Sequence, residues 1–290
     1  MSKKKKILIS SLLIIVVVFI IACLYLNKLH KEKETINYNN TPTIFVHGWG
    51  SDYQAEESMV KYAQTHSVTN TVVQANVSPS GKVSWIGSIK KGAKNPIIEA
   101  NFINNKSVPS KETNQAIALS KSSAYVKNVI IALQKKYHFR KINFVGHSMG
   151  NLQIAYYLRN NVDNQKMPQL CKQVSIAGHY NGYIGELNAP KHTSLSKNGL
   201  PNKMDTGYKG LLSLRKTFPR SAEVLNIYGD IGNNSDGAVM VNSARSYRYL
   251  ISSRARSYQE KEFYGKNAQH SQLHENKRVD RLLVKFLWGK

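Results

Sequence analysis

The stretch that most constrains the fold is residues 141–158, where a short apolar run leads through Gly-His-Ser-Met-Gly into a second, helix-like apolar run. A Gly-x-Ser-x-Gly pattern alone occurs by chance in about one chain in ten of this length. Between a strand and a helix, however, it predicts a sharp, strained turn that lifts the hydroxyl of Ser148 clear of a sheet. Gly146 and Gly150 are expected at this elbow because a side chain at either position would collide with the neighbouring strand or helix.

Strand-like and helix-like runs alternate along the rest of the chain. Strands are expected at residues 43–46, 173–177, 223–228 and 258–264, shorter extended pieces within 71–104, and helices at 113–137 and 276–288. Such alternation predicts a mostly parallel sheet with helices on both faces. Residues 178–208 are polar and rich in Gly, Pro, Asn and Lys, and they form a candidate cap segment.

A serine hydroxyl is a weak nucleophile at neutral pH, so it needs a base and an acid that orients the base. On this architecture the acid and then the histidine follow the serine, each after a strand. Asp236 is the favoured acid because its Asp-Gly-x-Val turn leads back into an apolar run, and Asp230 is the alternative. His270 is the favoured base. Its alternative, His274, is expected at the N-terminal edge of the last helix, where a positive charge is disfavoured.

The loop His47-Gly48-Trp49-Gly50 follows the first strand and is expected to supply a donor for a developing negative oxygen. Acyl transfer creates such an oxygen, and fixed backbone N–H groups stabilise it. The expected donors are the backbone N–H groups of Trp49 and Met149. The side chain of His47 is expected to be structural, while His66, His138, His179 and His192 are interpreted as structural or solvent-exposed. No cluster has metal-ligand spacing, so neither a metal nor another cofactor is expected.

The N-terminus predicts a membrane segment. Lys3 to Lys6 precede an almost unbroken apolar run from Ile7 to Leu26, and 20 residues just span a hydrocarbon core. Positive charges in front of the run favour export of the chain that follows it. An uncleaved anchor is favoured over two alternatives, a lipoprotein modified at Cys23 and an ordinary secreted protein.

The predicted organisation is therefore an anchor or signal peptide at 1–26, a polar tether at 27–40 and one domain at 41–290 outside the membrane. The formal net charge of +24 suits an anionic partner such as a cell-wall polymer. The basic residues are scattered and carry no nucleic-acid-binding motif, so a nucleic-acid partner is not expected.

Four ordered segments, FVHGWG, FVGHSMGN, SDGAV and AQHSQLHEN, resemble the α/β-hydrolase superfamily. More narrowly, they are similar to a family of Gram-positive bacterial cell-surface hydrolase domains of unassigned function. The resemblance covers residues 41–290. It implies the α/β-hydrolase fold, a triad of Ser148, Asp236 and His270, and an oxyanion hole at Trp49 and Met149.

The favoured function is a carboxylesterase that works through an acyl-enzyme on a small ester. Short to medium acyl chains are expected because residues 178–208 lack the apolar face of a lipase lid. The alternatives are an acyltransferase or peptidase-type hydrolase acting on cell-wall material, and a non-catalytic surface-binding module.

Overall fold

The computed structural model describes residues 14–27, 41–162 and 164–290. Lys3 to Lys6, the start of the predicted anchor and all of the tether after Asn27 lie outside the described residues. The chain divides into two units, and the N-terminal one contains the helix Ile14–Asn27. Apolar side chains are exposed all around this helix, among them Val18, Phe19 and Leu24. That pattern is typical of a membrane segment or a signal sequence.

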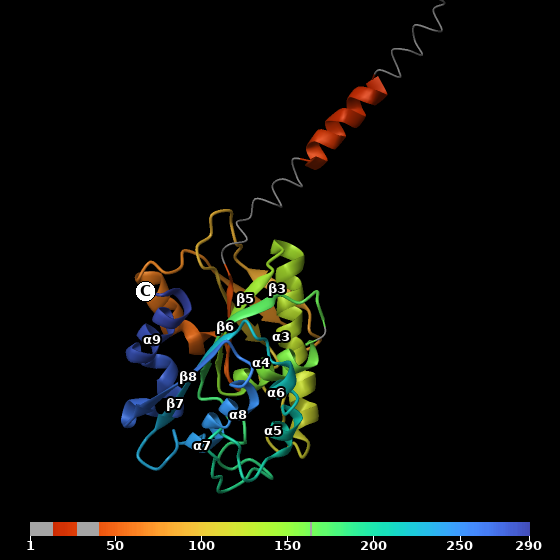
Figure 1. Ribbon diagram of the computed structural model, residues 1–290. Coiled ribbons are helices and arrows are strands. Elements are labelled where there is room, and N and C mark those ends of the chain that lie inside the picture. The colour runs from red at the N-terminus through yellow and green to blue at the C-terminus, as the bar shows by residue number, and fades with distance from the viewer. Residues whose placement is uncertain (1–13, 28–40, 163) are drawn as a thin grey trace, which may run out of the picture. The chain divides into compact units, whose positions relative to one another are not determined.

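The second unit is built on an eight-stranded sheet with the order β3-β2-β4-β1-β5-β6-β7-β8 (Figure 1). The strands are β1 (Thr43–Val46), β2 (Val72–Val77), β3 (Val83–Ile86), β4 (Ile97–Phe102), β5 (Lys141–His147), β6 (Gln169–Ile176), β7 (Glu223–Asp230) and β8 (Ser257–Tyr264). Every neighbouring pair is parallel except β2 and β3, which are antiparallel. The predicted parallel sheet is confirmed.

Helices cover both faces of the sheet, with α9 on one side and α3 on the other (Figure 1). The α-helices are α2 (Glu57–Thr65), α3 (Gln115–Tyr137), α4 (Met149–Asn160), α5 (Thr206–Gly210), α6 (Leu214–Thr217), α7 (Val241–Arg245), α8 (Tyr247–Ile251) and α9 (Lys277–Trp288). Three short 3-10 helices are η1 (Tyr53–Glu56), η2 (Lys266–Ala268) and η3 (His270–Glu275). One core cluster joins α2 and α9 to β1, β5, β6 and β7 through residues such as Met59, Val145, Ile227 and Leu283.

Helix α3 is the one helix in the described part of the chain that is long and apolar enough to cross a membrane. It packs against α4 and the sheet, and Leu119, Val126, Ile130, Leu133 and Tyr137 are buried. These five residues are the face expected from their three- and four-residue spacing. It is therefore a core helix of the domain.

The register of the sheet brings the carboxyl ends of five strands to one edge. Val46 of β1 pairs with Gly146, His147 with Ile176, Ile176 with Ile227, and Asp230 of β7 with Tyr264 of β8. The loops that follow β1, β5, β6, β7 and β8 therefore meet, as in other open α/β sheets, where ligands bind outside the carboxyl ends of the strands.

Residues 178–208 form neither a helix nor a strand before α5 begins at Thr206, apart from a single bridge between Leu195 and Pro201. Much of the segment packs on the α7–α8 region. The amide of Asn242 donates to the carbonyl of Thr193, and a Cβ at Gly199 would lie 3.1 Å from the backbone nitrogen of Tyr249. The beginning of the segment, by contrast, lies at the carboxyl edge of the sheet.

Candidate active site

Ser148 occupies the turn between β5 and α4 with φ 51° and ψ −123°, a conformation that L-residues rarely adopt. The turn is tight because α4 begins at Met149, three residues earlier than the helix-like run indicates. A Cβ at Gly150 would overlap the carbonyl oxygen of Val46 on β1, and one at Gly146 would lie 2.5 Å from Oδ1 of Asn151. Glycine is therefore required at both positions for α4 to approach the sheet this closely.

Asn151 holds the elbow in place, a role that the motif did not indicate. Its fully buried amide donates to the carbonyl of Ile176 at 2.9 Å and to that of Ser148 at 3.3 Å. The backbone N–H of Ser148 also donates to the Ile176 carbonyl, at 3.0 Å. The end of β6 thus fixes the strained turn from the side.

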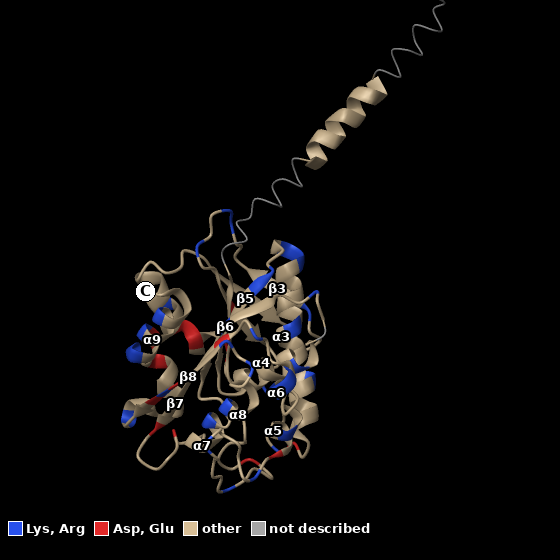
Figure 2. Ribbon diagram, in the orientation of Figure 1, with Lys and Arg blue, Asp and Glu red and all other residues tan. Residues whose placement is uncertain are grey.

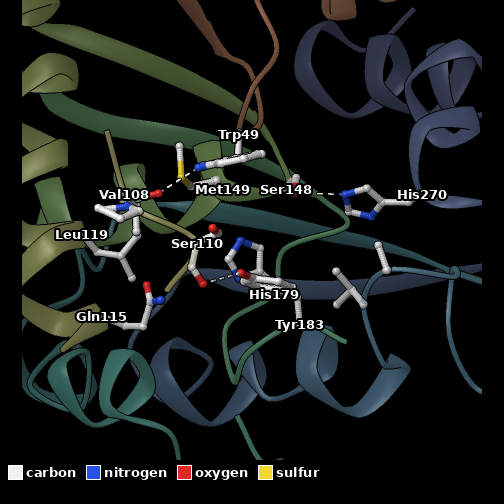
Figure 3. A pocket seen from close by; sticks show the side chains of 13 residues that line it. Trp49, Val108, Ser110, Gln115, Leu119, Ser148, Met149, His179, Tyr183 and His270 are labelled. Atoms are coloured by element: carbon white, nitrogen blue, oxygen red, sulfur yellow. Dashed lines mark hydrogen bonds between the residues drawn. The ribbon is translucent and has the colours of Figure 1, made fainter. Parts of the chain in front are cut away.

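The hydroxyl of Ser148 lies in one hydrogen-bonded row with His270 and Asp236. Ser148 Oγ is 3.0 Å from His270 Nε2, and His270 Nδ1 is 2.8 Å from Asp236 Oδ2 (Figure 3 shows the serine and the histidine). The other oxygen of Asp236 accepts the backbone N–H groups of Ala238 at 2.9 Å and Val239 at 2.6 Å. Asp236 is 1% exposed, so its carboxylate has a fixed orientation. This arrangement is able to take a proton from Ser148 and to stabilise the imidazolium that results.

Asp230, the alternative acid, has other partners. It is the last residue of β7, and its Oδ1 accepts the backbone N–H groups of Gly232, Asn233 and Asn234 at 2.8, 3.0 and 2.9 Å. This is the bonding of an aspartate that closes a turn.

His274, the alternative base, lies in the last turn of η3 and not at the edge of the final helix, whose N-cap is Asn276. The expected position of His274 was therefore wrong, because residues 270–275 form a separate short 3-10 helix that ends before α9 begins at Lys277. Its Nδ1 lies 3.1 Å from Oε1 of Glu275, whereas His270 begins η3 and faces Ser148.

Two backbone N–H groups lie beside Ser148 without acceptors in the described chain. Met149 is the first residue of α4, where backbone N–H groups have no partner within the helix. Trp49 follows Gly48, and a Cβ at Gly48 would lie 3.1 Å from Cβ of Ser148, so this loop packs against the elbow. Neither Trp49 N–H nor Met149 N–H donates a hydrogen bond to a described residue. Both are therefore free to bind a ligand oxygen.

Two further histidines lie near His270. His147 is buried behind it, with Nε2 3.1 Å from the His270 carbonyl oxygen and the two ring centroids 4.9 Å apart. Burial, followed by repulsion from His270 and His274, holds the pKa of His147 well below its usual range. Burial also lowers the pKa of His179 to about 4, with a smaller contribution from His270. Neither His147 nor His179 therefore places a positive charge beside His270 at pH 7.

His47 has a structural role, as expected. It is buried, its Nε2 accepts the backbone N–H of Phe102 at 3.0 Å, and its Nδ1 donates to the Gly48 carbonyl at 2.9 Å. Across the described residues, no group of three or more His, Cys, Asp or Glu side chains is arranged to hold a metal ion.

A pocket of about 320 Å³ opens on Ser148. Figure 3 shows Trp49, Val108, Leu119 and Met149 on one side of the serine and His270 on the other. The indole N–H of Trp49 donates to the carbonyl of Val108 at 2.8 Å, which fixes this apolar wall.

Sequence reasoning missed several residues of the pocket. Ser110 lies in the segment before α3, and Gln115 is the first residue of α3; this part of the sequence carries no motif. His179 was interpreted as structural or solvent-exposed. Tyr183 belongs to the candidate cap segment, and its hydroxyl donates to the Ser110 carbonyl at 3.4 Å across the pocket. Position after a parallel strand was the one signal for His179, since it follows β6 as Ser148 follows β5.

The sheet order, the strained serine elbow and the helices on both faces define the class of the α/β hydrolases. The chain belongs to the family described as alpha/beta hydrolase of unknown function (DUF915), which matches residues 30–290. The resemblance seen in the four sequence segments is thereby confirmed at the level of the family.

Two solved structures are similar over most of their length. The product of the gene lin2722 from Listeria innocua is 24% identical with a TM-score of 0.74, over 87% of this chain and 95% of the other. A protein from Lactobacillus plantarum WCFS1, described as a "putative cell surface hydrolase", is 24% identical with a TM-score of 0.69, over 86% and 92%. At this identity the likeness establishes the fold. No curated protein matches the chain.

Proposed function

We propose that this protein is a serine carboxylesterase that acts through an acyl-enzyme on esters of short to medium acyl chains at the cell surface. The observation that carries the proposal is the row Ser148 Oγ, His270 and Asp236, at 3.0 and 2.8 Å, beside two backbone N–H groups that have no acceptor among the described residues. A binding module has no need of a nucleophile, base, acid and donor pair in one place. The hydrogen-bonded row and the pair of N–H donors together serve acyl transfer.

In the proposed reaction His270 takes the proton of Ser148 as Oγ attacks the ester carbonyl carbon. The negative oxygen that forms is stabilised by the N–H groups of Trp49 and Met149, and Asp236 stabilises the imidazolium. The ester C–O bond then breaks, and the alcohol leaves with the proton from His270. Water, activated by the same histidine, releases the acid and restores Ser148.

The size and lining of the pocket support a small acyl group. A volume of about 320 Å³ is at the lower end of the roughly 300–1,000 Å³ typical of ligand sites. The wall opposite His270 is apolar, and the polar side chains of Ser110 and Gln115 also line the pocket.

The cell-surface location rests on the N-terminal segment. The helix Ile14–Asn27 exposes apolar side chains all around, and four lysines precede the apolar run. The Lactobacillus plantarum neighbour is described as a "putative cell surface hydrolase", which agrees with this location. The proposal includes an uncleaved membrane anchor, with an anionic cell-wall polymer as a further partner.

Labelling with a fluorophosphonate, followed by a chain-length series of p-nitrophenyl esters, tests the proposal. We expect Ser148-dependent labelling and the highest kcat/KM among acyl chains of short to medium length. Ser148→Ala should abolish labelling and lower kcat by a factor of about 10⁶. Ser271→Ala, which changes an exposed serine next to His270, serves as the matched control and should retain both.

Absence of both labelling and Ser148-dependent turnover would exclude the enzyme. Labelling accompanied by acyl transfer to an added alcohol or amine, at the expense of hydrolysis, would instead identify an acyltransferase. Cleavage of peptide substrates without ester turnover would identify a peptidase-type hydrolase.

A further inference from the structure

Two more cavities lie beside the proposed acyl pocket. The larger, about 940 Å³, is lined by residues 181–193 and by parts of 230–245, and it shares Tyr183 with the acyl pocket. The smaller, about 450 Å³, shares Asn242 and Arg245 with the larger one. The three cavities are therefore consecutive neighbours, with a common wall residue at each junction.

The loop that follows β7 lines both the acyl pocket, through Ala238 and Val239, and the larger cavity, through Asn234 and Met240. His270 must deliver its proton to the departing oxygen, so the alcohol part of the ester has to lie next to this ring. The loop after β7 carries Asp236, the partner of His270, and the same loop contributes Asn234 and Met240 to the larger cavity. The apolar wall of the acyl pocket lies on the side of Ser148 away from His270 (Figure 3).

The smaller cavity is cationic. Lys197, Arg245 and Arg248 line it, together with the carboxylate of Glu260. Other basic residues are spread over α3, α6 and α9 (Figure 2), but here two arginines of neighbouring helices and a lysine of the 178–208 segment meet in one hollow.

Glu260 is already saturated with donors. It accepts Arg248 Nε at 3.2 Å and the Tyr258 hydroxyl at 3.1 Å on Oε1, and Arg248 Nη2 at 3.0 Å and the Tyr228 hydroxyl at 3.5 Å on Oε2. A carboxylate offers about four lone-pair sites. Arg245 Nε approaches Oε2 only to 3.5 Å and has no hydrogen-bond acceptor among the described residues. The buried Nε faces Glu260, but the Arg245 side chain as a whole is 40% exposed and lines both cavities. The three basic side chains of the smaller cavity outnumber its one carboxylate, so positive charge remains for an anion at the boundary of the two cavities.

The larger cavity, which lies between the acyl pocket and the cationic cavity, has a polar lining but no excess of positive charge. Lys191 and Arg245 face Glu186, Asp230 and Glu262 around its lining. Asp230 is occupied by three backbone N–H groups, and Glu262 accepts the hydroxyl of Tyr264 at 2.6 Å. Such a lining suits hydroxyl groups better than it suits a charged group.

We propose that the substrate of this site is an ester whose alcohol is a long polyol chain bearing phosphate, with hydroxyl-rich units in the larger cavity and a phosphate at Arg245 and Lys197. This inference rests on the proposed function, since it identifies the alcohol that the ester hydrolysis releases. The acyl C–O bond breaks as described above, and the polyol phosphate chain leaves with one proton. Arginine suits the phosphate end because its planar fork matches phosphate oxygens.

The test compares two butyryl esters of equal chain length with the full-length protein in detergent at 0.15 M salt. One alcohol is a short oligo(glycerol phosphate) and the other is a neutral oligoglycerol. We expect a higher kcat/KM for the phosphate-bearing ester, and Arg245→Gln should lower the ratio of the two kcat/KM values about tenfold. Arg245→Lys should restore part of the ratio because it keeps the charge.

Lys135→Gln is the matched control for net charge. Lys135 is exposed and lies in the last turn of α3, 20 residues after Gln115 of the acyl pocket, which is roughly 30 Å along the helix. The control should leave the ratio unchanged. An equal effect of Lys135→Gln and Arg245→Gln would mean that only overall charge attracts the phosphate, and the inference would fall.

Equal kcat/KM values for the two esters in the wild type would also overturn the inference while the esterase stands. If neither ester is hydrolysed, the proposed function fails, and calorimetric titration of oligo(glycerol phosphate) into Ser148→Ala decides the cavity separately. Binding that Arg245→Gln weakens about tenfold supports the phosphate site. No binding, or binding that this change leaves intact, refutes it.

Discussion

At the scale of single residues, the two carboxylate oxygens of Asp236 bind different partners and together stabilise the site. One accepts the His270 ring and the other accepts the N–H groups of Ala238 and Val239, while the backbone carbonyl of Asp236 accepts the N–H of His270 at 2.9 Å. Asp236 thereby fixes both the carboxylate and the loop that carries the histidine. Asp230 uses its side chain on its own turn instead.

Replacing each aspartate by asparagine separates these roles. Asp236→Asn should lower kcat by a factor of about 10⁴, because an amide at this position no longer stabilises the imidazolium and favours the wrong tautomer of His270. Asp230→Asn keeps an acceptor oxygen for the turn and should leave kcat within about threefold of the wild type. Ester hydrolysis measures both, with circular dichroism as the check on folding. A large loss in Asp230→Asn with normal activity in Asp236→Asn would reverse the assignment.

At the scale of elements, the packing of η1 against β4 places two acidic side chains in the interior of the domain. Glu56 of η1 and Glu99 of β4 are both buried, and Glu56 Oε1 has no hydrogen-bond partner in the described chain. Burial, followed by the charge of Glu57, raises the pKa of Glu99 to about 7. Burial and then Glu99 raise the pKa of Glu56 well above its usual range. The packing of these two elements is therefore more favourable with protonated carboxyl groups.

Glu99→Gln should make the free energy of unfolding less dependent on pH. The folded state of the wild type binds more protons than the unfolded state between pH 4.5 and 7, so wild-type stability falls as the pH rises through this window. The amide stays neutral, so the variant should match the wild type near pH 4.5 and exceed it by on the order of 2 kcal/mol at pH 8. Urea unfolding at pH 5 and pH 8 measures the difference. Equal differences at both pH values would show that Glu99 does not titrate in this range.

At the scale of the whole molecule, the residues of the pocket all come from the second unit, at the carboxyl edge of one sheet. That unit has its own hydrophobic core, which joins α2 and α9 to the sheet. The helix Ile14–Asn27 supplies none of the lining side chains. Under the proposed function, catalysis and membrane attachment therefore belong to separate parts of the chain.

A protein that consists of residues 41–290 should therefore fold and keep its activity in solution. We expect kcat/KM on a soluble ester within about twofold of the full chain in detergent, since a domain with its own core folds independently. Cell fractionation should find the full chain in the membrane fraction and the shorter protein in the soluble fraction. Mass spectrometry of the N-terminus then distinguishes an uncleaved anchor from a chain lipidated at Cys23. An inactive or aggregated 41–290 protein would show that the N-terminal part is needed for the fold.

The sequence by itself determined the features that depend on neighbours a few residues apart. The strand Thr43–Val46, the buried face of α3 and the glycines around Ser148 follow from local periodicity and steric limits on the backbone, and the structure contains all of them. The order of the four motifs was sufficient to identify the fold.

The tertiary structure decided what depends on distant segments meeting. Asp230 is the last residue of β7 and Asp236 lies in the loop after it, and it was the turn between them that left Asp236 beside His270. Val108 and Tyr183 join the pocket from segments without motifs, and the cationic cavity joins Lys197 to Arg245. Parallel strand register and helix packing produce these contacts across tens to hundreds of residues, and no local pattern in the sequence encodes them.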